Sequence, residues 1–204
     1  MRTIGLIGGM SWQSSRLYYD RINQLVADRL GGAHSAQLIV FSIDFDPMAK
    51  MQAEGRWSEA GAVLADAARK LELAGADVIA IGANTMHKVA RQVTAATKLP
   101  LLHIGDALAA GLRDDARSKP LLLGTRYTME DPFMRDHLAA RGIEAIVPDK
   151  AGRDDLHAII YDQEESEFEV PRGFVELGLN ICAPPLMAYA TDQQKKHFLP
   201  KMAR

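Results

Sequence analysis

Small and polar residues stand three times between an apolar segment and a helix-like segment of the sequence. The three runs are GGMSWQSS from Gly8, ANTMH from Ala83 and GTRYTMED from Gly124. Free backbone N–H groups at the start of a helix attract carboxylates and phosphates. Turns at the carboxyl ends of parallel strands are also where open α/β proteins bind ligands. Together the three turns predict a site for a small anionic metabolite.

Each turn also has a purely structural interpretation. Gly8 and Gly9 permit a tight backbone turn, and Ser11 or Ser14 can cap the helix that follows. Neither the dinucleotide pattern nor the phosphate-loop pattern is present. In the third turn, Thr128 is the expected helix cap, because it precedes Asp131 at capping-box spacing. Any one of these turns is therefore weak evidence for a ligand.

For the other residues with reactive or metal-binding side chains, the sequence predicts structural roles. His87 and His103 have no Glu or Cys at a metal-ligand spacing, so we expect structural histidines and no metal site. The nucleophile elbow of a Ser-His-Asp hydrolase is missing. From the residue types alone we expect an exposed helix position for Gln52, and core positions for Met48 and Trp57.

The elements that must position these turns alternate between strands and helices. Apolar segments typical of buried strands occupy residues 3–8, 37–43, 77–81, 100–104, 119–124 and 143–147. Helical patterns occupy residues 14–30, 58–73, 85–94, 106–116 and 129–141, with Ser58 as the expected cap of the second. This alternation predicts an α/β fold whose parallel sheets are covered on both faces. It also suggests two similar halves.

Composition excludes several classes of protein. The net charge of -2 gives no reason to expect nucleic acid as a partner. No segment is apolar enough to span a membrane, and MRTIGLIGG is too short for a signal peptide. The one cysteine, Cys182, excludes an intrachain disulfide and is expected to be a small buried hydrophobe. These features predict a cytoplasmic protein with no membrane partner.

Several long segments resemble the aspartate/glutamate racemase family, in its broad-specificity amino-acid racemase branch. They are TIGLIGGMSWQSSRLYYDRIN, LGGAHSAQLIVFSIDF, QAEGRW, LAGADVIAIGANTMHKVA and LLLGTRYTME. The resemblance covers about residues 1–162. It implies two α/β domains with a cleft between them, racemisation without a cofactor, and a homodimer. Two acid/base residues, usually cysteines, would face opposite sides of the substrate Cα, because a single base would restore the same enantiomer.

The resemblance carries over to individual positions. Met10, Gln52, Asn84 and Thr85 match substrate-contacting positions, so the partner is a small amino acid or dicarboxylate. The first acid/base position, directly before the Asn-Thr pair, is Ala83. The second lies in a GCTE-type motif that this sequence does not contain. The resemblance therefore describes a substrate pocket without its proton-transfer groups.

The alternating pattern stops near residue 163. An acidic stretch and a Pro-Arg-Gly break follow, and residues 173–204 resemble part of the helical N-terminal region of acyl-CoA dehydrogenases. We expect a first domain over residues 1–100, a partial second domain over 101–162, and an unrelated tail over 163–204 that is mostly helical or irregular. Three hypotheses remain: a catalytically impaired racemase, a non-catalytic protein that binds an amino acid or small carboxylate, and a fragment without function.

Overall fold

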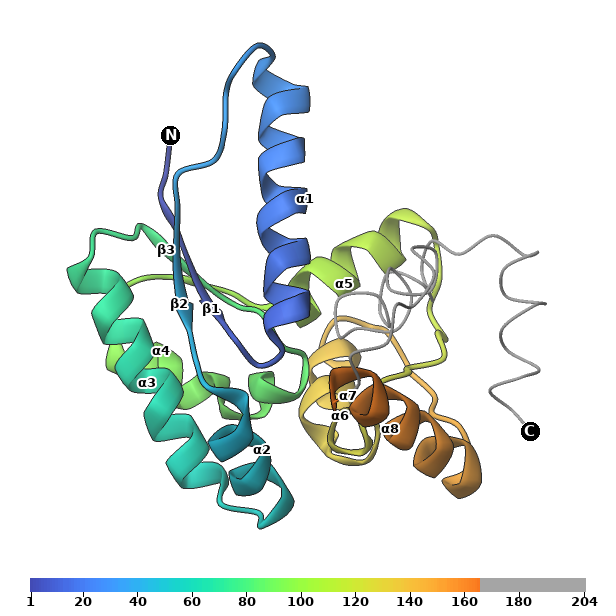
Figure 1. Cartoon of the computed structure of the whole chain (residues 1–204). Coiled ribbons are helices and arrows are strands. Elements are labelled where there is room, and N and C mark those ends of the chain that lie inside the picture. Colours follow the sequence, from blue (N-terminus) through green and yellow to red (C-terminus); the bar gives the residue numbers. More distant parts are fainter. Residues whose placement is uncertain (166–204) are drawn as a thin grey trace. The chain divides into compact units, whose positions relative to one another are not determined.

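The computed structural model describes the backbone of residues 1–165 and the side chains of residues 1–161. The chain divides into two compact units, Met1–His103 and Ile104–Arg204 (Figure 1). The predicted tail, including Cys182, lies outside the described residues. Among the helices of the described part, none is long and apolar enough to cross a bilayer.

The first unit is built around a parallel sheet of four strands. The strands β1 (Ile4–Gly8), β2 (Leu38–Ser42), β3 (Val78–Ile81) and β4 (Leu101–Leu102) lie in the order β2-β1-β3-β4. Leu6 pairs with Val40 on one side and with Ala80 on the other, so β1 is central. This confirms the predicted parallel α/β fold. The segment expected to open the second half, residues 100–104, instead supplies the short edge strand β4 of this sheet.

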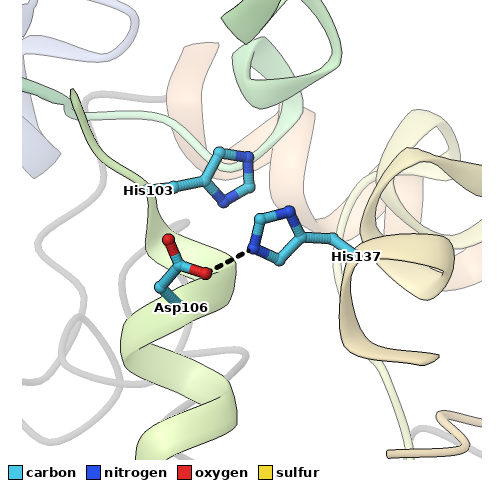
Figure 2. Close-up of side chains that lie close together, drawn as sticks. All are labelled: His103, Asp106 and His137. Carbon is cyan, nitrogen blue, oxygen red and sulfur yellow. Dashed lines mark hydrogen bonds and ion pairs between the residues drawn. The ribbon is translucent and has the colours of Figure 1, made fainter. Parts of the chain in front are cut away.

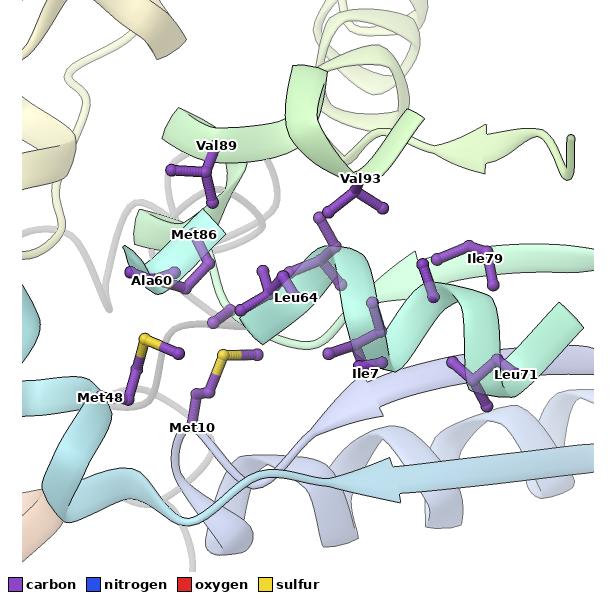
Figure 3. Close-up of a cluster of buried hydrophobic side chains, with 14 of the residues drawn as sticks. Ile7, Met10, Met48, Ala60, Leu64, Leu71, Ile79, Met86, Val89 and Val93 are labelled. Carbon is purple, nitrogen blue, oxygen red and sulfur yellow. The ribbon is translucent and has the colours of Figure 1, made fainter. Parts of the chain in front are cut away.

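Helices cover both faces of this sheet. The helices of the unit are α1 (Trp12–Leu30), α2 (Phe45–Ala53), α3 (Trp57–Leu73), the 3-10 helix η1 (Thr85–Val89) and α4 (Ala90–Ala96). Ile7 packs with Leu64 and Leu71 of α3 in the core that Figure 3 shows. On the opposite face, a Cβ at Gly8 would meet the Ser15 hydroxyl of α1 at 2.6 Å. The alternation of side chains along β1 thus places α1 and α3 on opposite faces.

Two predicted helix boundaries are wrong for reasons of local hydrogen bonding. Ser58 does not cap α3, because the helix already begins at Trp57 and Arg56 holds the cap position. The predicted helix over residues 85–94 is two elements, since η1 has 3-10 geometry before α4 begins. By contrast, the predicted end of the first helix is confirmed: Gly31, at φ 75°, follows Leu30 and donates to the carbonyl of Ala27 at 2.8 Å.

The second unit contains four described helices around short extended segments. They are α5 (Ile104–Asp114), α6 (Arg126–Glu130), α7 (Pro132–Ala139) and α8 (Lys150–Glu165). The predicted strands at 119–124 and 143–147 meet in parallel, but only as one bridge between Leu121 and Ile146. No further strand among the described residues extends this pair, so its ladder stays short. α8 runs without a break through residues 162 and 163, where a domain boundary is predicted from the sequence.

The short extended segment of this unit separates two small cores. Leu122 belongs to a cluster with Ala109, Leu112, Met134, Leu138 and Ile143. The next residue, Leu123, packs with Met129, Leu156 and Ile160 of the other cluster. Successive side chains therefore bury against α5 and α7 on one side and against α6 and α8 on the other, which is the layered arrangement of an α/β unit.

Candidate functional site

The turns that follow β1 and β3 begin side by side in the first unit. Ile7 pairs with Ile81, so Gly8 and Gly82 are the next residues on two neighbouring strands. The backbone N–H of Gly82 donates to the carbonyl of Ile7 at 2.8 Å. Between these strands the sheet order reverses direction, because β2 lies on one side of β1 and β3 on the other. Ligands in open α/β sheets bind at this switch point.

The first turn is held by glycines and serines. Gly9 has a φ of 86°, and a Cβ there would lie 2.1 Å from the carbonyl oxygen of Ile43, so only glycine fits. Ser11 caps α1, as predicted, with its hydroxyl accepting from the N–H of Ser14. The hydroxyl of Ser15 accepts from the N–H of Gly9 at 2.8 Å and donates to the carbonyl of Ser11 at 3.0 Å. Ser15 thus also organises the turn, whereas the sequence predicted a role only for Ser11 or Ser14.

All five predicted site positions lie in the first unit and are buried. They are Met10, Gln52, Ala83, Asn84 and Thr85. Met10 and Ala83 belong to the same apolar cluster, together with Met48 and Met86. Met48 is therefore a core residue, as expected, and Trp57 packs against the same cluster. The structure brings these positions into one region at the carboxyl ends of β1 and β3.

Gln52 differs from its expected exposed position. Its side chain is 4% exposed, because α2 presents it to the same core that holds Met86. The Nε2 atom of Gln52 lies 3.2 Å from the Sδ atom of Met86, in the turn after β3. Sequence periodicity could not place it, since α2 is only nine residues long. This contact joins α2 to the turn that carries Asn84.

Asn84 is the most unusual polar side chain of the region. It is 1% exposed, and among the described residues neither its Nδ2 nor its Oδ1 atom has a hydrogen-bond partner. Leaving a buried amide unpaired costs about 1–3 kcal/mol. Such a group is expected at a strained or ligand-binding position rather than in an ordinary core.

Two buried neighbours of Asn84 complete the second turn. Ala83 is 3% exposed, so the position predicted for the first acid/base residue carries a buried methyl group. The Nδ1 atom of His87 lies 2.9 Å from the carbonyl oxygen of Ala83, and its ring meets that of His103 edge to face with centroids 4.6 Å apart. Lys88, the next residue, lies over the ring of Trp57 at 3.9 Å. His87 is buried in protein contacts, as expected of a structural histidine.

The third predicted turn lies in the second unit. Its helix α6 is capped by Thr125, whose hydroxyl accepts from the N–H of Thr128. The predicted cap, Thr128, is therefore wrong by one turn of helix, and its side chain is buried inside α6. The N–H of Arg126 donates to the Nδ1 atom of His157 at 3.3 Å, which ties α6 to α8.

Ionisable side chains also meet between α5 and α7. The Nε2 atom of His137 lies 2.8 Å from a carboxylate oxygen of Asp106, as the dashed line in Figure 2 marks. Arg141 forms an ion pair with the same oxygen. His103, also drawn there, is the last residue of the first unit. Because Asp106 interacts with both His137 and Arg141, this cluster holds α5 against α7.

Comparison with known proteins identifies the lineage. The Asp/Glu/Hydantoin racemase family model matches residues 7–180, which extends past residue 162, where the resemblance in the sequence was expected to end. The broad specificity amino-acid racemase RacX of Bacillus subtilis is 26% identical over 159 residues, and the match covers 72% of this chain and 64% of that protein. The chain thus spans less than two thirds of this relative.

Solved structures agree with this match. A crystal structure from Yersinia pestis, assigned as an Asp/Glu racemase, is 41% identical with a TM-score of 0.79 and covers 95% of this chain and 90% of its own. An aspartate racemase homologue from Pyrococcus horikoshii is 26% identical with a TM-score of 0.73, and the whole of both chains is covered. The chain therefore belongs to the Asp/Glu/hydantoin racemase family.

Proposed function

We propose that the chain binds a small amino acid or dicarboxylate at the turns after β1 and β3 and does not racemise it. In this proposal it is a racemase by descent that keeps substrate-binding residues and lacks proton transfer. The single observation that carries the proposal is Asn84, whose buried amide has no partner among the described residues. A bound carboxylate would supply an acceptor for its two N–H donors.

The surroundings of Asn84 suit an anion. Helix α1 has 19 residues and begins directly after the glycine turn, so the positive end of its dipole lies at this edge of the sheet. The turn is rigid, because Ser15 and Ser11 hold its backbone. Preorganised donors of this kind stabilise a carboxylate without rearrangement. Met10, Gln52 and Thr85 supply the neighbouring contacts that the family resemblance implies.

Ala83 is the reason to propose that catalysis is impaired. Racemisation needs one group to remove the α-proton and another to return a proton to the opposite face. A methyl group can do neither, and each positioned acid/base group contributes about 10²–10⁴ in rate. The one cysteine of the 204 residues, Cys182, does not stand in the second acid/base motif of the family. The chain would therefore bind the amino acid without racemising it.

Two measurements on the same protein test this proposal. Calorimetry with D- and L-aspartate, D- and L-glutamate and malonate should show millimolar or tighter binding, and exchange of the Cα proton in deuterated water should stay at background. Asn84→Leu should abolish the heat. Racemisation well above background would contradict the proposed impairment. The absence of binding heat with every ligand would contradict the proposed binding.

The alternative is a non-catalytic protein whose own function is to bind a small carboxylate or an amino acid. The unpaired amide of Asn84 favours it over a fragment without function, since an unused buried amide would only destabilise the fold. A ligand-induced rise in melting temperature without Cα exchange supports this alternative. The resemblance also leads us to propose a homodimer, which analytical ultracentrifugation would test.

A further inference from the structure

His87 occupies an unusual position relative to the turn that carries Asn84. Its side chain is 3% exposed, and its Nδ1 atom lies 2.9 Å from the carbonyl oxygen of Ala83. A carbonyl oxygen only accepts hydrogen bonds, so the Nδ1 atom must carry the proton and donate it. This contact requires a proton on Nδ1 of His87.

His87 also accounts for the 3-10 geometry of η1. In an α-helix the backbone N–H of residue 87 would donate to the carbonyl of residue 83. Here that N–H donates to the carbonyl of Asn84 at 3.1 Å, one residue closer. The imidazole of His87 takes the Ala83 carbonyl instead. Side chain and backbone of one residue therefore bind two successive carbonyls, which keeps η1 tight.

The captured carbonyl belongs to the peptide plane that leads into Asn84. Because the peptide unit is planar, a hydrogen bond to the oxygen of Ala83 also sets the direction of the Asn84 N–H and the position of its Cα. The side chain of Asn84 leaves from this Cα, at a φ of -61°, so a shift of the plane would move the buried amide with it. His103, at the carboxyl end of β4, supports the imidazole edge to face at 4.6 Å. The ring thus has a packing contact besides its hydrogen bond to the carbonyl.

We propose that His87 is a positioning residue for the amino-acid site, acting through the Ala83–Asn84 peptide rather than on the ligand. This proposal rests on the proposed function for its effect on affinity, but not for its effect on the turn. The proton on Nδ1 of His87, donated to the Ala83 carbonyl, aims the Asn84 amide. Loss of that donor should leave the amide present but misdirected.

Two substitutions separate this role from simple packing. In His87→Asn the amide nitrogen replaces Nδ1 at about the same place on the side chain, so the donor is kept while most of the ring is lost. In His87→Leu the buried volume is kept and the donor is lost. If the donor matters, the leucine variant should bind about tenfold more weakly, as expected for a lost hydrogen bond of about 1.4 kcal/mol. The asparagine variant should recover most of this loss.

Nuclear magnetic resonance gives readouts that need no ligand. In the wild-type chain, long-range ¹H–¹⁵N correlations of the imidazole should show the proton on Nδ1 of His87. The backbone and side-chain amide signals of Asn84 should move in His87→Leu and stay near their wild-type positions in His87→Asn. His103→Asn, which removes ring packing without touching the Ala83 carbonyl, is the matched control and should move these signals less.

The outcomes distinguish the two proposals. If no ligand binds the wild type but the tautomer and the Asn84 signals behave as stated, the proposed function fails and the positioning role stands. A proton on Nε2 alone, unmoved Asn84 signals in the leucine variant, or equal damage in both variants overturns the positioning role. Should His87→Leu fail to fold, the tautomer and the asparagine variant still decide.

Discussion

The hydroxyl of Ser15 joins the first turn of α1 to the backbone of Gly9, accepting from its N–H at 2.8 Å and donating to the carbonyl of Ser11 at 3.0 Å. The turn that meets the ligand in our proposal is therefore held from inside the helix that follows it. A neighbouring serine, Ser14, also donates to the carbonyl of Ser11, at 3.1 Å, but its hydroxyl is not needed by Gly9.

Ser15→Ala should destabilise the chain because it leaves the buried N–H of Gly9 without its acceptor. The expected loss in the free energy of unfolding is about 1–3 kcal/mol. Ser14→Ala is the control and should cost less, since the carbonyl of Ser11 keeps its bond from Ser15. Denaturant unfolding of both variants measures the difference. Equal losses would show that the Gly9 contact has no special weight.

Gly9→Ala should be far more damaging than the same change at another glycine with positive φ. At Gly9 a Cβ would lie 2.1 Å from the carbonyl oxygen of Ile43, so the backbone of two turns must separate. At Gly31, φ is 75°, ψ is 179° and nothing lies within 4 Å of the added atom, so only backbone strain of about 1–3 kcal/mol applies. Thermal unfolding should show a small shift for Gly31→Ala and a loss of cooperative folding or a much larger shift for Gly9→Ala.

Asn84→Leu should raise stability while it removes binding. The substitution replaces an unpaired buried amide with an apolar group, which removes a cost of about 1–3 kcal/mol. Asn23 offers the opposite case, because its amide donates to the carbonyl of Tyr19 and accepts from the N–H of Ala36, both at 2.9 Å. Asn23→Leu should therefore destabilise. An equal loss of stability in both variants would show that the Asn84 amide is hydrogen-bonded in the folded chain.

Stability should fall in acid through His157. Burial lowers the pKa of His157, the positive charge of Arg126 lowers it further, and Asp154 and Glu130 oppose the shift. The folded chain binds this proton less tightly than the unfolded chain, so the contribution is complete above pH of about 6.5 and is lost as pH falls through the lowered folded value. Protonation of Nδ1 would also end its bond from the N–H of Arg126.

The difference between the wild type and His157→Gln isolates this contribution from that of other groups. Melting temperatures measured between pH 4.5 and 8 should converge for the two proteins at the acid end. A constant difference across the range would mean that His157 does not titrate in this window.

Ala83→Cys should restore proton exchange without restoring racemisation. A single thiolate can remove the α-proton and return a deuteron only to the same face, so one enantiomer should exchange slowly and keep its configuration. Ala83→Ser is the control and should stay at background. The measurement is deuterium incorporation together with chiral chromatography. Inversion by the cysteine variant alone would reveal a second acid/base group, and Cys182→Ser would then be the next variant to make.

The sequence was informative where a pattern is both long and local. The 19 residues of α1 and the apolar strands β1, β2 and β3 lie close to their predicted bounds, because buried parallel strands read as apolar runs and Gly31 ends the helix. The strands predicted at 119–124 and 143–147 form only one bridge. Strand pairing depends on the side chains of neighbouring strands, which an apolar run does not specify.

The family resemblance supplied the residues of the proposed site but did not predict which atoms they contact. Nothing in residue types predicts that Gln52 would be buried against Met86, because the short α2 has too few turns for a periodic signal. The helix caps Arg56 and Thr125 each lie a few residues before the predicted Ser58 and Thr128, since several polar residues near a helix start can serve equally well in sequence. At α6 the bond from the N–H of Thr128 to the Thr125 hydroxyl identifies the cap, whereas Arg56 stands at the start of α3 without a side-chain capping bond.

The pairing of β1 with β3 has a consequence for the order in which the site is made. Thr3 and Asp77 bond to each other across 74 positions, and the glycine turn at the start of the chain gains its neighbour at Gly82 only through the strand that begins at Val78. During synthesis from the amino end, the first turn therefore lacks its neighbouring turn until residue 82 has emerged from the ribosome. Until then β1 can pair only with β2, and its other edge is open to any nascent strand nearby.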